Sequence, residues 1–80
     1  MDNANIGEVL ALLRQQAELE TQIMNGHGMA IASERQLEAT CRRLIAHPQA
    51  LNAVLHTACA LRRSPDTISV RDVTDLGWSN

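Results

Sequence analysis

The residue types best suited to chemistry in this chain are three histidines and two cysteines. His56 and Cys59 are three positions apart and would share one face of a helix. Cys41, His47 and His27 come from other segments. A zinc site needs such side chains at short, regular spacing, and the sequence has neither a C-x-x-C nor an H-x-x-x-H motif. We therefore expect no metal site, only two buried thiols and ordinary histidines.

Nucleophilic catalysis would need one cysteine to be activated beside a histidine. A reactive thiol requires an electropositive and partly exposed setting, but Cys41 and Cys59 both stand in apolar helical patterns that predict burial. Segment 25–28, Asn-Gly-His-Gly, lacks the preceding strand and the following lysine of a phosphate-binding loop. We expect a protein that is not an enzyme and binds no cofactor.

Arginine supplies all the strongly basic side chains, with seven arginines and no lysine. The formal net charge is −2, whereas nucleic-acid-binding domains usually show a basic excess. Two neighbouring predicted helices nevertheless contain five arginines: Arg35, Arg42, Arg43, Arg62 and Arg63. Segment 67–73 also has the form of a helix-turn-helix opening, although a recognition helix would need about 15 further residues. We expect a solvated arginine face, and a small DNA-binding regulator is the alternative.

The length and the apolar composition indicate the fold class. Eighty residues make one domain, spanning 1–80, and so short a chain buries only about 60% of its unfolded surface. Trp78 is the only aromatic residue, so aliphatic side chains must fill the core. That composition suits helix-on-helix packing better than a sheet. We expect an all-α unit of three to four helices with a long N-terminal helix, completed by homodimerisation.

Capping and turn signals place the helices over about 5–25, 34–46, 48–63 and 69–76. Ser33 and Gln36 have the spacing of a capping box, and Ser69 with Asp72 repeats that logic. Pro48 disfavours helical backbone in the residue before it. The second helix should therefore end there and the third begin with the proline, with a single kinked helix as the rival interpretation.

Apolar spacing predicts which residues of the later helices are buried. In the second helix these are Leu37, Cys41, Leu44 and Ile45, and in the third Leu51, Val54, Leu55, Ala58 and Leu61. Trp78 directly follows the last helix, where its ring is either a lid over the core or a contact for a partner.

The first helix carries the clearest sign of a partner. A 3-4-3-4-3 spacing, typical of one helix packing along another, joins Ile6, Val9, Leu13, Gln16, Glu20 and Ile23. Gln16 and Glu20 are polar and lie in mid-seam, where burial is costly unless each finds a partner. Polar residues placed in this way often fix register or partner identity. We expect a homodimer through this helix, and the alternative is that its end leaves the core and both residues face water.

Part of the chain resembles a known family. Segment 28–31 reads Gly-Met-Ala-Ile and leads into Ser-Glu-Arg-Gln-Leu at 33–37 and a closing Arg-Leu at 43–44. With the preceding helix ending in Ile-Met at 23–24, this order resembles the small AriR/YmgB-type connector proteins. The resemblance covers about residues 18–55, and the chain departs from it at His-Pro, 47–48, where that family continues into an acidic stretch. It implies a dimeric helical regulator acting through signalling proteins in stress or biofilm control, without catalytic residues.

The remaining features concern location. The N-terminal Met-Asp-Asn lacks the basic region of a secretory leader, and no apolar run approaches the roughly 18 residues of a membrane span. We expect a cytoplasmic protein without a membrane partner. The sequence therefore predicts a non-enzymatic adaptor or regulator that binds another protein, a class that includes inhibitors and secretion chaperones.

Overall fold

The computed structural model describes residues 3–25 and 31–78, with side chains described for 5–25 and 33–78. The elements in chain order are α1 (Asn3–Met24), α2 (Ile31–Ile45), α3 (Pro48–Leu61), the 3-10 turn η1 (Pro65–Thr67) and α4 (Val70–Asp75). The described residues form helices and turns and contain no strand, which confirms the all-α prediction. None of the described helices is long and apolar enough to cross a bilayer.

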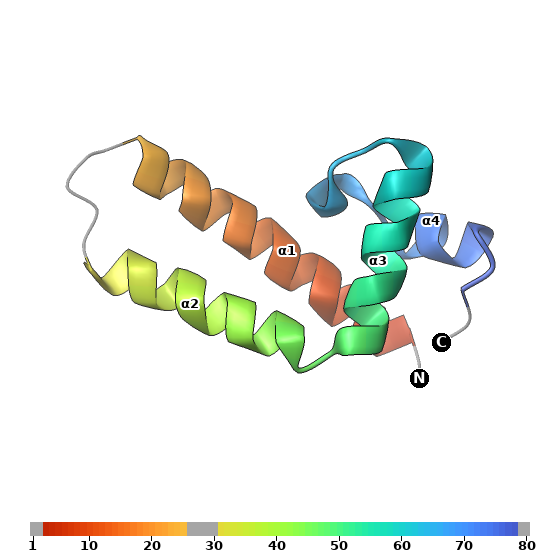
Figure 1. The fold of residues 1–80 in the computed structure, drawn as a ribbon, viewed down its shortest axis with the longest axis horizontal. Coiled ribbons are helices and arrows are strands. Elements are labelled where there is room, and N and C mark those ends of the chain that lie inside the picture. Colours follow the sequence, from red (N-terminus) through yellow and green to blue (C-terminus); the bar gives the residue numbers. More distant parts are fainter. Residues whose placement is uncertain (1–2, 26–30, 79–80) are drawn as a thin grey trace.

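The two longest helices, α1 and α2, lie side by side as an antiparallel hairpin, and α3 leaves the end of α2 at a steep angle (Figure 1). The chain then returns through η1, which packs on α1, to α4 beside α3. The Cα atoms extend over 43 × 24 × 14 Å, so the molecule is elongated along the hairpin.

The core lies at one end of the hairpin, where the N-terminal half of α1 meets α3 and the segment around α4. Its buried members are Ile6, Val9, Leu10, Leu12, Leu44, Ala50, Ala53, Val54, Ala58, Ile68 and Val73. Complete burial of one isoleucine or valine side chain stabilises the fold by about 1.5–3 kcal/mol. Trp78 packs against this cluster from outside, in the position of the predicted lid.

The start of α2 differs from the prediction. The helix begins at Ile31, three residues before the expected start at 34, and Ser33 therefore lies inside its first turn. An N-cap residue has non-helical backbone angles, so the predicted capping box of Ser33 and Gln36 is wrong. The residues directly before Ile31 are outside the described part of the chain.

The break between α2 and α3 settles the choice between two helices and one kinked helix. Helix α2 ends at Ile45, α3 begins at Pro48, and His47 between them has φ −122° and ψ 62°. Proline at the first position of α3 lacks only an N–H that no helical carbonyl would accept. Two separate helices are therefore confirmed.

The end of α3 comes two residues before the expected position at 63. Arg62 adopts the left-handed conformation with φ 54°, and its N–H lies 3.2 Å from the carbonyl oxygen of Cys59. The N–H of Arg63 donates to the carbonyl oxygen of Ala58 at 2.9 Å. These two bonds satisfy helix-end carbonyls in the manner of a Schellman motif.

The capping box of α4 is confirmed. The Ser69 hydroxyl accepts the N–H of Asp72 at 3.2 Å, and the Asp72 carboxylate accepts the N–H of Ser69 at 2.9 Å. Ser69 is thus the cap of a helix that spans Val70–Asp75. The reciprocal bonds hold a helix that is too short to be stable alone.

Candidate protein-binding site

Two residues of the predicted dimer seam belong to the core of their own chain. Ile6 and Val9 are both 0% exposed and pack within the core cluster. A second copy could touch them only if the chain unfolded locally. The prediction that Ile6 and Val9 contact a partner is therefore corrected.

The polar centre of the seam also finds a partner inside the chain. The Gln16 Nε2 donates a 3.4 Å hydrogen bond to Sγ of Cys41, on the facing side of α2. Leu13 and Ile23 are half-buried, and Glu20 is exposed. The spacing in α1 thus describes packing against α2 and α3, with only Glu20 turned to the solvent.

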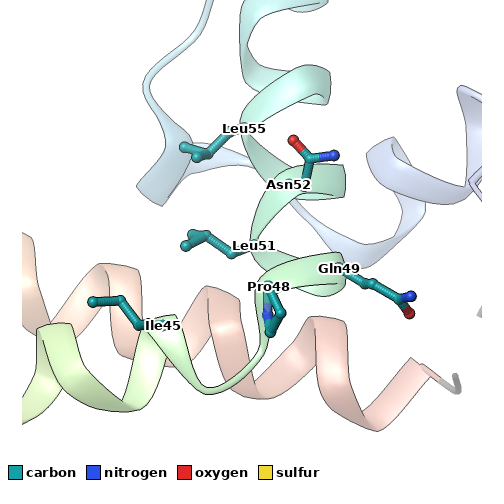
Figure 2. A pocket seen from close by; sticks show the side chains of 6 residues that line it. All are labelled: Ile45, Pro48, Gln49, Leu51, Asn52 and Leu55. Atoms are coloured by element: carbon teal, nitrogen blue, oxygen red, sulfur yellow. The ribbon is translucent and has the colours of Figure 1, made fainter.

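An open apolar groove lies in the angle between α2 and α3. A groove of about 420 Å³ is lined by Ile45, Pro48, Gln49, Leu51, Asn52 and Leu55. Figure 2 shows Ile45, Leu51 and Leu55 projecting to the same side of α3, while Gln49 and Asn52 leave in other directions. Ile45 is 70% exposed and Leu55 is 42% exposed. We call these six residues the corner groove.

The corner groove exists because the His47-Pro48 break turns α3 across the end of α2. Leu51 and Leu55 are one helical turn apart and therefore share a face of α3. The neighbouring face of α3 is directed into the core through Ala53 and Val54. Apolar residues thus cover more of α3 than the core can bury.

The sequence assigned Ile45, Leu51 and Leu55 to buried stripes, and this was wrong for Ile45 and Leu55, because both are exposed. Leu61, expected to be buried, is also exposed. The sequence did contain a signal of this exposure, because the run from Ala50 to Leu55 is apolar at all but one position. A helix with so many consecutive apolar residues cannot direct all of them into one core.

A second, smaller pocket of about 160 Å³ lies between α1 and η1. Its lining residues are Leu13, Gln16, Ala17, Glu20, Pro65 and Asp66. Arg14 on α1 joins the two elements. Its Nε donates a hydrogen bond to the carbonyl oxygen of Asp66 and its Nη2 donates one to that of Ile68, both at 3.2 Å. This pocket is therefore a gap in the packing of η1 on α1 within one chain.

The five arginines of the predicted basic surface are exposed, but three of them pair with carboxylates. Arg42 lies 2.6 Å from Glu38, Arg43 lies 3.4 Å from Glu8, and Arg63 lies 3.5 Å from Asp72. Arg35 and Arg62 are exposed on α2 and at the end of α3. Acidic side chains are thus interleaved with the basic ones.

The cysteines and histidines that the structure describes do not converge on one site. Cys41 is half-buried, but Cys59 is exposed, so the prediction of two buried thiols is wrong for Cys59. His56 stacks edge-on with Trp78, with ring centroids 5.7 Å apart, and His27 lies outside the described residues. Among the described residues no group of three potential metal ligands occurs.

Comparison with protein-family models, curated proteins and solved structures gives no significant match to this chain.

Proposed function

We propose that this chain is a cytoplasmic, non-enzymatic protein-binding regulator whose first partner is a second copy of itself, held at the corner groove. The observation that carries the proposal is an uncharged groove beside a large apolar side chain, Ile45, that is 70% exposed. Large contiguous exposed apolar patches often mark surfaces that bind protein partners.

The chemistry of the corner groove favours an apolar helix as its occupant. Its walls are two helices, and Leu51 and Leu55 form a ridge along one of them. Grooves of this kind receive the apolar face of a helix, with anchors one turn apart. The occupant must therefore present an aliphatic side chain such as that of Ile45.

The absence of charged residues in the corner groove permits a second copy to bind there. In a dimer with twofold symmetry each patch faces the same patch of the other copy, so a charged patch would meet its own sign. None of the residues that line the corner groove is ionisable, although 20% of the chain is charged. Two copies can therefore meet at this groove without repulsion, with Ile45 of each against Leu51 and Leu55 of the other.

A stable dimer needs a contact larger than the corner groove alone. A standard interface covers about 800 Å² on each partner, which is roughly 15% of this chain's 5234 Å² surface. A second copy would therefore have to cover adjoining surfaces of α2 and α3 as well as the groove. We further propose that the dimer then modulates another protein, the role that the AriR/YmgB-like order of residues 18–55 would imply.

Sedimentation equilibrium at micromolar concentrations tests the proposal with wild type and Ile45→Glu. We expect a dimer for wild type and a monomer for Ile45→Glu, because the substitution would bury an unpaired carboxylate against Leu51 and Leu55 of the other copy. Met24→Glu is the matched control, since Met24 is an even more exposed apolar residue, at 85%, but lies at the far end of α1.

A dimer that persists in Ile45→Glu would overturn the assignment of the groove. A wild-type chain that stays monomeric would exclude a second copy as the occupant. Capture of a different protein by wild type but not by Ile45→Glu would then place that protein in the groove.

A further inference from the structure

Helix α3 has one face in the core and the opposite face open to solvent. Four of its exposed residues, which we call the α3 stripe, recur at 4-3-4 spacing: Pro48, Asn52, Leu55 and Cys59. This is the spacing by which one helix packs along another. Figure 2 shows Asn52 and Leu55 projecting to different sides of α3, as alternate residues of such a line do. The α3 stripe therefore has the pattern of a helix contact that its own chain leaves open.

The whole of α3 is uncharged. None of its 14 residues is an aspartate, glutamate, lysine or arginine, although 20% of the chain is charged. The solvent side of a surface helix ordinarily carries charged residues opposite its apolar side. The exposed face of α3 departs from that rule over its full length, so it can be covered by another helix without burying a charge.

The α3 stripe continues the corner groove. Pro48, Asn52 and Leu55 line the groove, and Cys59 lies one helical turn beyond Leu55. From Pro48 to Cys59 the stripe runs for about 17 Å, at 1.5 Å per residue. A standard interface of about 800 Å² on each partner requires more surface than the groove. A second copy seated at the groove would gain that surface along this stripe.

The charges at the end of α3 favour an antiparallel pair. Arg62 and Arg63 directly follow the helix and are exposed. In a parallel pair these arginines would lie side by side and the helix dipoles would be aligned, whereas an antiparallel pair places the arginines at opposite ends. A twofold axis then brings a residue near the middle of the stripe against its own copy.

Asn52 is suited to that position. Its amide is both a donor and an acceptor, so two Asn52 side chains can form hydrogen bonds with each other. A single asparagine within an apolar helix contact fixes register and the number of chains. An axis near Asn52 places Pro48 of one copy close to Leu55 of the other, and Ile45 lines the groove beside Pro48.

We propose that the α3 helices of two copies pack antiparallel along the α3 stripe, with the two Asn52 side chains paired beside the twofold axis. Cys59 of each copy then lies against the corner between α2 and α3 of the other. This inference rests on the proposed function, because it gives the geometry of the same dimer.

The first test measures the dimer dissociation constant by sedimentation equilibrium for wild type, Asn52→Asp and Cys59→Asp. We expect each substitution to raise it at least about tenfold, because a carboxylate would be buried in the contact. Both positions are exposed within one chain, so urea unfolding of the monomer should show a folded protein. Gln22→Asp is the matched control, at an exposed position near the far end of α1.

Mild oxidation tests the antiparallel direction. An axis near Asn52 separates the two Cys59 residues by about 20 Å along the helices, whereas the Cα atoms of a disulfide lie within about 7 Å of each other. Wild type should therefore form no disulfide through Cys59. Asn52→Cys/Cys59→Ala should form a covalent dimer, seen on a non-reducing gel.

Each outcome separates this inference from the proposed function. A dimer that is unaffected by Cys59→Asp but lost in Ile45→Glu would refute packing along the α3 stripe and leave the groove as the contact. A covalent wild-type dimer through Cys59 would refute the antiparallel direction. A wild-type chain that stays monomeric would refute both proposals.

Discussion

Gln16 on α1 donates its side-chain N–H to Sγ of Cys41 on α2, across 3.4 Å and 25 positions of sequence. This bond gives a polar residue in the middle of an apolar seam a partner from its own chain. The seam of α1 is thus satisfied at Gln16 by a contact within one molecule.

Replacement of Gln16 by leucine should therefore leave the oligomeric state unchanged. We expect a change in the free energy of unfolding of at most about 1 kcal/mol, because one hydrogen bond to sulfur is lost and apolar contact is gained. Chemical unfolding and sedimentation measure the two quantities. Higher oligomers in Gln16→Leu, without any change in Ile45→Glu, would show that α1 pairs with another copy after all.

Ser69→Ala should destabilise the chain by about 1 kcal/mol, the usual effect of removing an N-cap side chain. The Ser69 hydroxyl satisfies the N–H of Asp72, which otherwise has no helical acceptor. Ser64→Ala is the matched control, because Ser64 precedes η1 without a side-chain capping bond. Equal effects of the two substitutions in urea unfolding would contradict the assigned role of the cap.

Acid should weaken the same cap. The N–H of Ser69 donates to the Asp72 carboxylate and lowers its pKa below the ordinary value, and the Ser69 hydroxyl and the Arg63 guanidinium act in the same direction. Because the pKa is lowered in the folded state, the stabilisation is present above the unfolded-state value of about 3.9 and is lost as pH falls through the folded value. Asp72→Ala should therefore be less stable than wild type at neutral pH.

The difference between Asp72→Ala and wild type should shrink as the pH drops below about 4. Thermal unfolding over a pH series measures it, with Asp75→Ala as the control at an exposed position in the last turn of the same helix. A difference that stays constant down to about pH 2 would refute the charge-based account of the cap.

We expect no phosphate-driven binding of duplex DNA to this chain, which would be recognised by a steep loss of affinity as salt rises. Arg42, Arg43 and Arg63 each lie beside a carboxylate, so phosphates would have to displace acidic partners. Fluorescence anisotropy with labelled duplex at roughly 50 and 200 mM salt measures the effect. Binding at the lower salt that weakens steeply at the higher would support the DNA-binding alternative, and its loss in Arg62→Ala would identify the surface.

The sequence predicted the features that depend on neighbouring residues. One is the capping box of Ser69 and Asp72, and the other is the helix break at Pro48. Each depends on side-chain or ring geometry within a few positions, and each is present in the structure. The cap predicted at Ser33 is wrong because the helix extends back to Ile31. Ser33 and Gln36 do have the spacing of a capping box, but both residues lie inside the helix.

The candidate site could not be predicted in the same way. The spacing of Ile6 and Val9 shows that α1 packs along another helix, but it does not distinguish α2 of the same chain from a helix of a second one. Likewise, the apolar spacing predicted that Leu51, Val54 and Leu55 are all buried, without showing that the core would take Val54 and leave Leu55 exposed. Which face is left open is decided by contacts between helices far apart in the sequence.

The most direct test of the central claim is an isotope-filtered nuclear Overhauser measurement on a dimer mixed from labelled and unlabelled chains. We expect cross-peaks between the methyl groups of Ile45 in one copy and those of Leu51 and Leu55 in the other. Intermolecular cross-peaks confined to residues of α1, such as Ile23, or a complete absence of such peaks would contradict the proposal that the corner groove holds a second copy.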